Sequence, residues 1–200
     1  MERDEIAVKV KLRLDELGPF EEGQVIDSGR IDAFLDDCAD TLQKTVPPWI
    51  VEPVSMVLVA VAYDDYTGYV TLPSDFLQLV SFKMENWKRS VTEAITEHDP
   101  RYKRQFYEQL RGKFTKPVAV FRTKFGVGKV LDYYSVQSGE HTVEHGTYLK
   151  SVPAEELDEI LIDPLSWLVA ETILSSVGEI ELAKAARAKL VEWINTRIAI

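Results

Sequence analysis

The sequence contains one cysteine, Cys38, and three histidines. A lone cysteine can form neither an intrachain disulfide nor a thiolate cage for a metal ion, which suits a protein made in a reducing cytoplasm. Cys38 is therefore expected to be a buried structural thiol. No Ser–His–Asp or Cys–His set has a local signature around these residues, so the sequence does not indicate nucleophilic catalysis.

A long apolar run and an apolar N-terminus are also missing. Residues 1–5 are charged where a signal peptide would be apolar, and the longest apolar run, residues 54–63, is about half as long as a membrane span. We therefore expect a protein that is not exported and has no membrane partner.

The chain has no overall excess of basic residues. Its formal net charge is −10, which argues against a surface that grips nucleic acid throughout. The charge is unevenly distributed, because residues 101–129 carry nine basic side chains and one acid, Glu108, whereas residues 155–181 carry eight acids and no base. Such blocks are either solvated surface or the two different patches that a head-to-tail contact requires.

Apolar periodicity predicts helices at both ends of the chain and short strands between them. Residues 3–17, a segment from 28 to Pro47, and residues 179–197 show helical spacing, as do the residues around Asp163-Pro164, where one helix is kinked or a second begins. The middle contains runs typical of strands: 54–63, 69–72, 79–84, 91–95, 118–125, 129–136 and 142–149.

These patterns predict an α+β fold in which helices from the two termini pack together. Residues 1–53 and 151–200 would form the helical part, and residues 54–150 a β-rich antiparallel part with one short helix. That helix is predicted to start at Asp99-Pro100, with Tyr102, Phe106 and Leu110 on one face.

One motif suggests metal chemistry: residues 141–145 read H-x-x-E-H, the inverted signature of zinc hydrolases. A shared zinc requires a helix, but the surrounding glycines and β-branched residues favour a strand. There the two imidazoles would stand about 13 Å apart, at roughly 3.3 Å per residue. We therefore expect no metal or other cofactor. A metal-dependent hydrolase using His141, Glu144 and His145 is kept as the alternative function.

The segment Gly126–Lys129 is similar to the end of a phosphate-binding loop, but Val130 follows the lysine and strand patterns flank it, so a hairpin turn is favoured. Aromatic side chains are frequent in the middle of the chain and are expected to pack in its core; the alternative is that they stack on the bases of single-stranded nucleic acid. They are Phe76, Phe82, Trp87, Tyr102, Phe106, Tyr107, Phe121, Tyr133 and Tyr134.

The run YVTLPSDFLQLVSF at residues 69–82, followed by WKRSV at 87–91, resembles the LP-x-DF segment of head–tail connector and tail-tube adaptor proteins of short-tailed and related bacteriophages. The crAss-like phages of the gut carry ring proteins of this family, and the resemblance extends to them. The resemblance covers roughly residues 66–150, since similar features continue through Asp99-Pro100, Arg111-Gly112, Lys116-Pro117-Val118 and Leu131–Tyr134.

The resemblance implies a non-enzymatic virion protein that is assembled in the host cytoplasm. Its copies would form a ring on the twelvefold axis of the portal, contact the portal protein and the tail or further connector proteins, and surround the channel through which double-stranded DNA leaves the head. Net negative charge suits such a channel, because each neutralised phosphate would add binding that resists sliding.

Two sets of residues are candidates for contacts within this assembly. Arg104, Lys113 and Lys116 are expected to be exposed and to form inter-subunit charge contacts. At the C-terminus, Arg197, Ile198 and Ile200 either fold back onto the terminal helices or dock into a groove of the portal or of the adjacent subunit.

Overall fold

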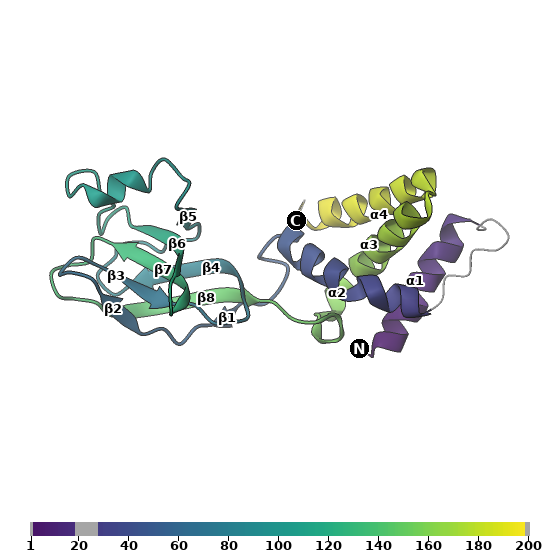
Figure 1. Cartoon of the computed structure of the whole chain (residues 1–200), viewed down its shortest axis with the longest axis horizontal. Helices are drawn as coiled ribbons and strands as arrows, with labels where there is room; N and C mark the ends of the chain where they lie inside the picture. Colours follow the sequence, from purple (N-terminus) through teal and green to yellow (C-terminus); the bar gives the residue numbers. More distant parts are fainter. Residues whose placement is uncertain (1, 19–27, 199–200) are drawn as a thin grey trace. The chain divides into compact units, whose positions relative to one another are not determined.

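The computed structural model describes residues 2–18 and 28–198, the last of these by its backbone only. Its fold is α+β, which confirms the predicted class. The chain forms two compact units, one of residues 1–51 and 151–200 and the other of residues 52–150 (Figure 1). The sequence suggested boundaries at 53/54 and 150/151. We refer to the two parts as the helical unit and the β unit.

In its described residues the helical unit contains four α-helices and one 3-10 turn. The central helix, α3, packs against the other three (Figure 1). Its hydrophobic core is drawn from both ends of the chain, as the sequence predicted. The elements are α1 (Arg3–Leu17), α2 (Ser28–Thr45), the turn η2 (Ala154–Glu156), α3 (Glu159–Val177) and α4 (Ile180–Ile198).

Local residues define both ends of α3. The side chain of Asp158 accepts a hydrogen bond from the backbone N–H of Ile160 at the start, and Gly178, with φ of 88°, closes the end in the left-handed conformation. Pro164 lies inside this single helix, so it does not start a second one. By length and composition α3 could also cross a membrane, but here α1, α2 and α4 surround it, as for the core helix of a bundle.

Ion pairs within the helical unit neutralise part of the acidic block at residues 155–181. Three of the eight acids in that block are paired with arginines of α1 or α4. The block is therefore less available for contacts with other molecules than its sequence suggests. The pairs are Arg3 with Glu155, Arg13 with Asp163, and Arg187 with Glu171.

The described residues of the β unit form two sheets. One has the strand order β1-β8-β4 and the other β2-β3-β7-β6-β5. All pairs are antiparallel except β5 with β6, which is parallel. The strands are β1 (Val54–Ser55), β2 (Ala60–Ala62), β3 (Thr67–Thr71), β4 (Phe76–Met84), β5 (Ile95–Thr96), β6 (Val118–Lys124), β7 (Gly128–Tyr134) and β8 (Val143–Lys150).

The core of the β unit contains Phe82, Trp87, Leu131 and Tyr133, each with little or no exposed surface. Phe82 and Trp87 meet edge to face with ring centroids 5.5 Å apart, a favourable aromatic geometry. Of the aromatic residues expected in the core, these two, Phe76, Tyr133 and Tyr134 are buried, and Tyr102 and Phe121 are half-buried.

Two details of the β unit differ from the sequence prediction. The helix expected after Asp99 is only a 3-10 turn, η1 (Lys103–Phe106). Phe106 and Leu110, which were to form its buried face, are exposed, and short helices without a packed face are marginal in water. The run 91–95 also forms little strand, since Val91 makes only an isolated bridge to Phe82 before β5 begins.

Candidate functional site

The three metal-ligand candidates of the H-x-x-E-H motif each contact a residue outside the motif, and His145 Nδ1 also lies 3.7 Å from a carboxylate oxygen of Glu144. His141 precedes β8, and its Nδ1 lies 2.8 Å from the Tyr133 hydroxyl. Glu144 pairs with Lys83 at 2.5 Å, and His145 Nε2 lies 3.0 Å from Ser81 Oγ. The prediction of a strand here is confirmed by β8. Among the described residues, no group of three His, Cys, Asp or Glu side chains is placed to hold a metal ion.

The most conspicuous feature of the β unit is exposed apolar surface. Of the seventeen large hydrophobic side chains that are exposed in the described residues, twelve belong to this unit. Contiguous exposed apolar patches are unusual on a monomeric protein and commonly mark contacts with other molecules. The twelve are Val54, Val57, Val59, Val61, Tyr63, Tyr66, Phe106, Tyr107, Leu110, Phe114, Phe125 and Val127.

One group lies on the segment 54–62, which begins as β1 and ends as β2. Both are edge strands, so one segment borders both sheets (Figure 1). Met56 and Leu58 pack on the core, and Leu58 passes so close to Gly146 that a Cβ there would lie 2.7 Å from its methyl group. The alternate side chains are exposed, and an exposed apolar edge can take up a strand of another chain. They are Val57, Val59 and Val61.

A second group lies on residues 97–117, which we call the basic loop. Arg104, Lys113 and Lys116 are exposed there, as predicted from the sequence, and they form no ion pair with any described residue. Four exposed apolar side chains share the loop: Phe106, Tyr107, Leu110 and Phe114. The expectation that Phe106 and Tyr107 would be buried is wrong.

The loop is nevertheless held in place by one buried side chain, Gln105. Its Nε2 donates to the Arg101 carbonyl and its Oε1 accepts from the Gly112 N–H, each at 2.9 Å. The exposed side chains of the basic loop are thus presented by an ordered backbone.

The third exposed group is the tip of the β6–β7 hairpin. Phe125 is fully exposed, and the turn depends on Gly126 and Gly128, which have φ of 75° and 104°. These left-handed conformations suit glycine because it has no Cβ. The hairpin itself was predicted from the sequence, but the exposure of Phe125 was not.

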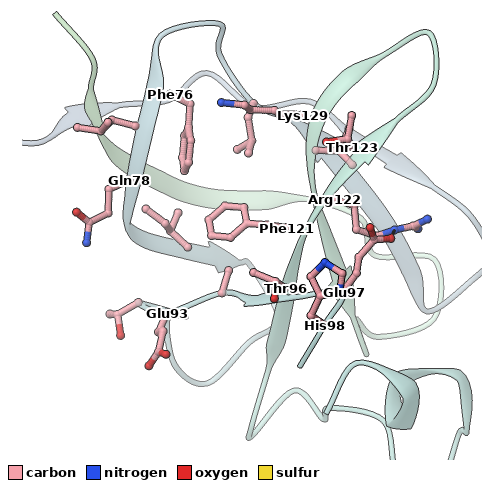
Figure 2. A pocket seen from close by; sticks show the side chains of 16 residues that line it. Phe76, Gln78, Glu93, Thr96, Glu97, His98, Phe121, Arg122, Thr123 and Lys129 are labelled. Carbon is pink, nitrogen blue, oxygen red and sulfur yellow. Dashed lines mark hydrogen bonds and ion pairs between the residues drawn. The ribbon is translucent and has the colours of Figure 1, made fainter. Parts of the chain in front are cut away.

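The β unit also contains an open pocket of about 510 Å³. It lies between the edge strands β4 and β5, and residues of β6 and β7 complete its lining. In Figure 2, Phe76 and Phe121 face its interior, whereas Glu97 and Arg122 stand together at one wall. The pocket combines an apolar floor with a polar rim, which is the usual composition of a binding site.

A buried ion pair fixes the wall of the pocket. Arg122 donates to the buried carboxylate of Asp132 at 2.9 Å and to Glu97 at 2.8 Å, and these bonds raise the pKa of its guanidinium. The Tyr63 hydroxyl donates to the same Asp132 at 3.0 Å. The Tyr63 ring is partly exposed, but its hydroxyl points inward to Asp132, and the desolvation of this hydroxyl, followed by the charge of Asp132, raises the pKa of Tyr63. This network has a structural role.

A search of models of known protein families found no match for this chain, and a search of curated proteins found no significantly similar sequence. What the surfaces do must therefore be inferred from their own chemistry and from the motif resemblance.

The C-terminal docking candidates are only partly described. Arg197 is exposed in the last turn of α4, with its guanidinium carbon 5.3 Å from the centroid of the Trp193 ring. The side chain of Ile198 and all of Ile200 lie outside the described residues.

Sequence analysis did not anticipate two of these exposed groups: the row of Val57, Val59 and Val61, which we call the valine row, and Phe125 at the hairpin tip. A signal for the first was present, since residues 54–63 are apolar at almost every position rather than at every second one. In a strand, such a run leaves apolar side chains on both faces.

Proposed function

We propose that this protein is a non-enzymatic structural protein of a tailed bacteriophage virion. It forms a ring that joins the portal, and hence the head, to the tail and lines the channel through which DNA leaves. The observation that carries the proposal is the concentration of exposed apolar side chains on the β unit, which suits a protein that buries this surface against neighbouring subunits. The resemblance of residues 69–82 to the LP-x-DF segment of connector proteins is the reason for proposing a bacteriophage virion.

The arrangement of these surfaces supports a head-to-tail contact. The valine row, the basic loop and the hairpin tip are different patches, and a repeated contact between two different patches closes into a ring when its rotation permits. The net charge of −10 is compatible with a channel that DNA passes through without being held. Ring symmetry would follow the twelvefold axis of the portal.

Electron microscopy of purified virions tests this proposal. We expect density for the protein between portal and tail, loss of that density in particles made without it, and a free chain that stays monomeric or weakly associated at micromolar concentration until it meets the portal. Absence of the protein from virions would sink the proposal. A stable free ring would count against assembly on the portal.

The C-terminal residues 197–200 are proposed to dock on the portal or on the adjacent subunit, with Ile198 and Ile200 as anchors and Arg197 steering. Deleting these four residues is expected to leave the thermal midpoint of the free chain unchanged and to abolish attachment to the head. A fold-back role instead predicts a lower thermal midpoint with attachment retained, and that result would refute docking.

A second candidate function is binding of single-stranded nucleic acid by the basic loop. The exposed Phe106 and Tyr107, close in sequence to the exposed cations Lys103 and Arg104, provide the two components that such binders use. This function predicts micromolar or tighter binding to an oligonucleotide that weakens steeply as salt is raised. Salt-independent or undetectable binding would exclude it.

A further inference from the structure

We infer that the pocket between β4 and β5 receives the β6–β7 hairpin tip of a second copy of this chain, with Phe125 as the inserted side chain. This deepens the proposed function, on which it rests for the choice of a second copy as the partner. It names the contact through which neighbouring subunits of the ring would engage.

The hairpin tip has the properties of an inserting group. A phenylalanine that is fully exposed in the free chain loses contact with water when it enters an apolar pocket, and aromatic anchors of this kind contribute most to binding at interfaces. The two strands of the hairpin pair along their length, from Val118 opposite Tyr134 to Lys124 opposite Gly128. The tip is therefore presented by a paired support, which limits the entropy lost on docking.

The pocket has the matching properties. Its interior offers Phe76, Leu79 and Phe121, and its volume of about 510 Å³ falls within the usual range of roughly 300–1,000 Å³ for binding pockets. It lies where an edge strand of one sheet meets an edge strand of the other, so it is open to an incoming segment. The chain's own Phe125 does not fill it, although Thr123 and Lys129 of the same hairpin lie at its wall.

One charge contact is compatible with the same pairing. Residues 122–130 of the hairpin carry three basic side chains and no acid. Two of these bases, Arg122 and Lys129, also line the pocket beside Glu93 and Glu97, and Arg122 is paired with Glu97, so the lining itself is close to neutral. Glu93 is exposed and forms no salt bridge with a described residue, and Lys124 of the incoming hairpin can meet it by leaving the face of its own Tyr69 ring, whose centroid lies 3.9 Å from the Lys124 amine.

Tip and pocket are different patches of one chain, so the contact is heterologous. Each copy uses its tip on one neighbour and its pocket on the other, as a ring requires. Reciprocal exchange between two copies would instead give a closed dimer, and particle size distinguishes the two.

Photocrosslinking of the full chain tests the contact. Phe125 is replaced by benzoylphenylalanine, labelled and unlabelled chains are mixed, and crosslinked peptides are mapped by mass spectrometry in the concentrated protein and in assembled virions. We expect crosslinks between chains that map to residues 72–79 or 92–98. Crosslinks to another surface, crosslinks within one chain only, or none would overturn the inference.

Two matched variants sharpen the result. Thr96→Trp occupies the pocket from the exposed edge strand β5 and is expected to abolish the crosslink. Gln137→Trp places the same side chain on an exposed loop outside the pocket and should leave the crosslink in place. A crosslink that survives Thr96→Trp overturns the inference.

Phe125→Ala is a separate test. Because Phe125 is fully exposed, its truncation removes no packing within the chain, and the variant should fold normally. We expect Phe125→Ala to lose assembly and Phe125→Leu to restore part of it.

The test separates this inference from the proposed function. Virions that contain the protein at the head–tail joint, but show crosslinks away from the pocket, would refute the contact and leave the ring proposal standing. Crosslinks at the pocket in a protein that is absent from virions would refute the virion role.

Discussion

Arg104, Lys113 and Lys116 are the residues at which charge can be changed with the least disturbance to folding. All three are exposed and make no ion pair with a described residue. Reversing them together to glutamate is expected to change the free energy of unfolding by less than about 1 kcal/mol, because such surface changes cost little. Assembly onto particles should fall sharply. Denaturant unfolding and particle binding measure the two effects.

The matched control is Arg122→Met, also within residues 101–129. Arg122 balances the buried carboxylate of Asp132, and removing one partner of a buried pair costs roughly 3 kcal/mol. This variant should therefore lose stability. If the triple charge reversal destabilises the chain as much as Arg122→Met does, the three side chains are structural and the charge-contact hypothesis fails.

The accessibility of the Cys38 thiol to a labelling reagent reports on the packing of the helical unit. It is buried between α2 and α3, where its Sγ lies 3.4 Å from Thr172 Oγ1. Burial raises the pKa of the Cys38 thiol, so at neutral pH the reactive thiolate is scarcer than for a free cysteine. A thiol reagent should label no cysteine in the native chain and one in denaturant. Rapid native labelling would show that these helices open locally.

At the scale of elements, the basic loop shows how one polar side chain can order a segment that lacks a core. Gln105→Ala leaves the Gly112 N–H and the Arg101 carbonyl without their partner, a loss of about 1–3 kcal/mol. Leu110→Ala, at an exposed position of the same loop, should cost almost nothing. Thermal unfolding compares them, and equal effects would mean that Leu110 packs in solution.

The same loop shows why apolar spacing misled the helix prediction. Tyr102, Phe106 and Leu110 recur at helical spacing, but Phe106 and Leu110 are each more than half exposed, and only Tyr102 is half-buried. Periodicity predicts a helix on the assumption that the apolar face is buried within the same chain. Where the apolar side chains are exposed, that assumption fails, and the spacing carries no information about helix formation.

At the scale of the whole molecule, the two units have separate hydrophobic cores that share no residue. The β unit is inserted between α2 and α3, and its first and last strands are neighbours, with Val54 paired to Tyr148. Adjacent ends are what an inserted domain needs if it is to fold by itself. We therefore predict that residues 52–150, expressed alone, unfold cooperatively on heating.

The complementary variant joins residue 51 to residue 151 through a short Gly/Ser linker. It should retain its helical circular dichroism, because each residue of the helical core remains present. A fragment 52–150 without a cooperative transition would show that the β unit depends on the helices for its stability.

The sequence by itself determined the class of fold, the helices of the termini and most of the strands. These features depend on local causes: apolar spacing, Asp158 and Gly178 at the ends of α3, and the glycines of the β6–β7 turn. It also favoured a strand over a zinc-binding helix at residues 141–145, because β-branched residues and flanking glycines act locally.

Only the tertiary structure decided which apolar side chains are exposed to solvent. Phe106 and Phe125 are as hydrophobic as core residues, and nothing local distinguishes them from Phe82 or Leu131. Burial depends on which strands become neighbours, and that is set by contacts between residues distant in sequence. For the same reason the pocket could not be anticipated: it exists because β4 and β5 are edge strands of different sheets, and no short segment of the chain specifies that arrangement.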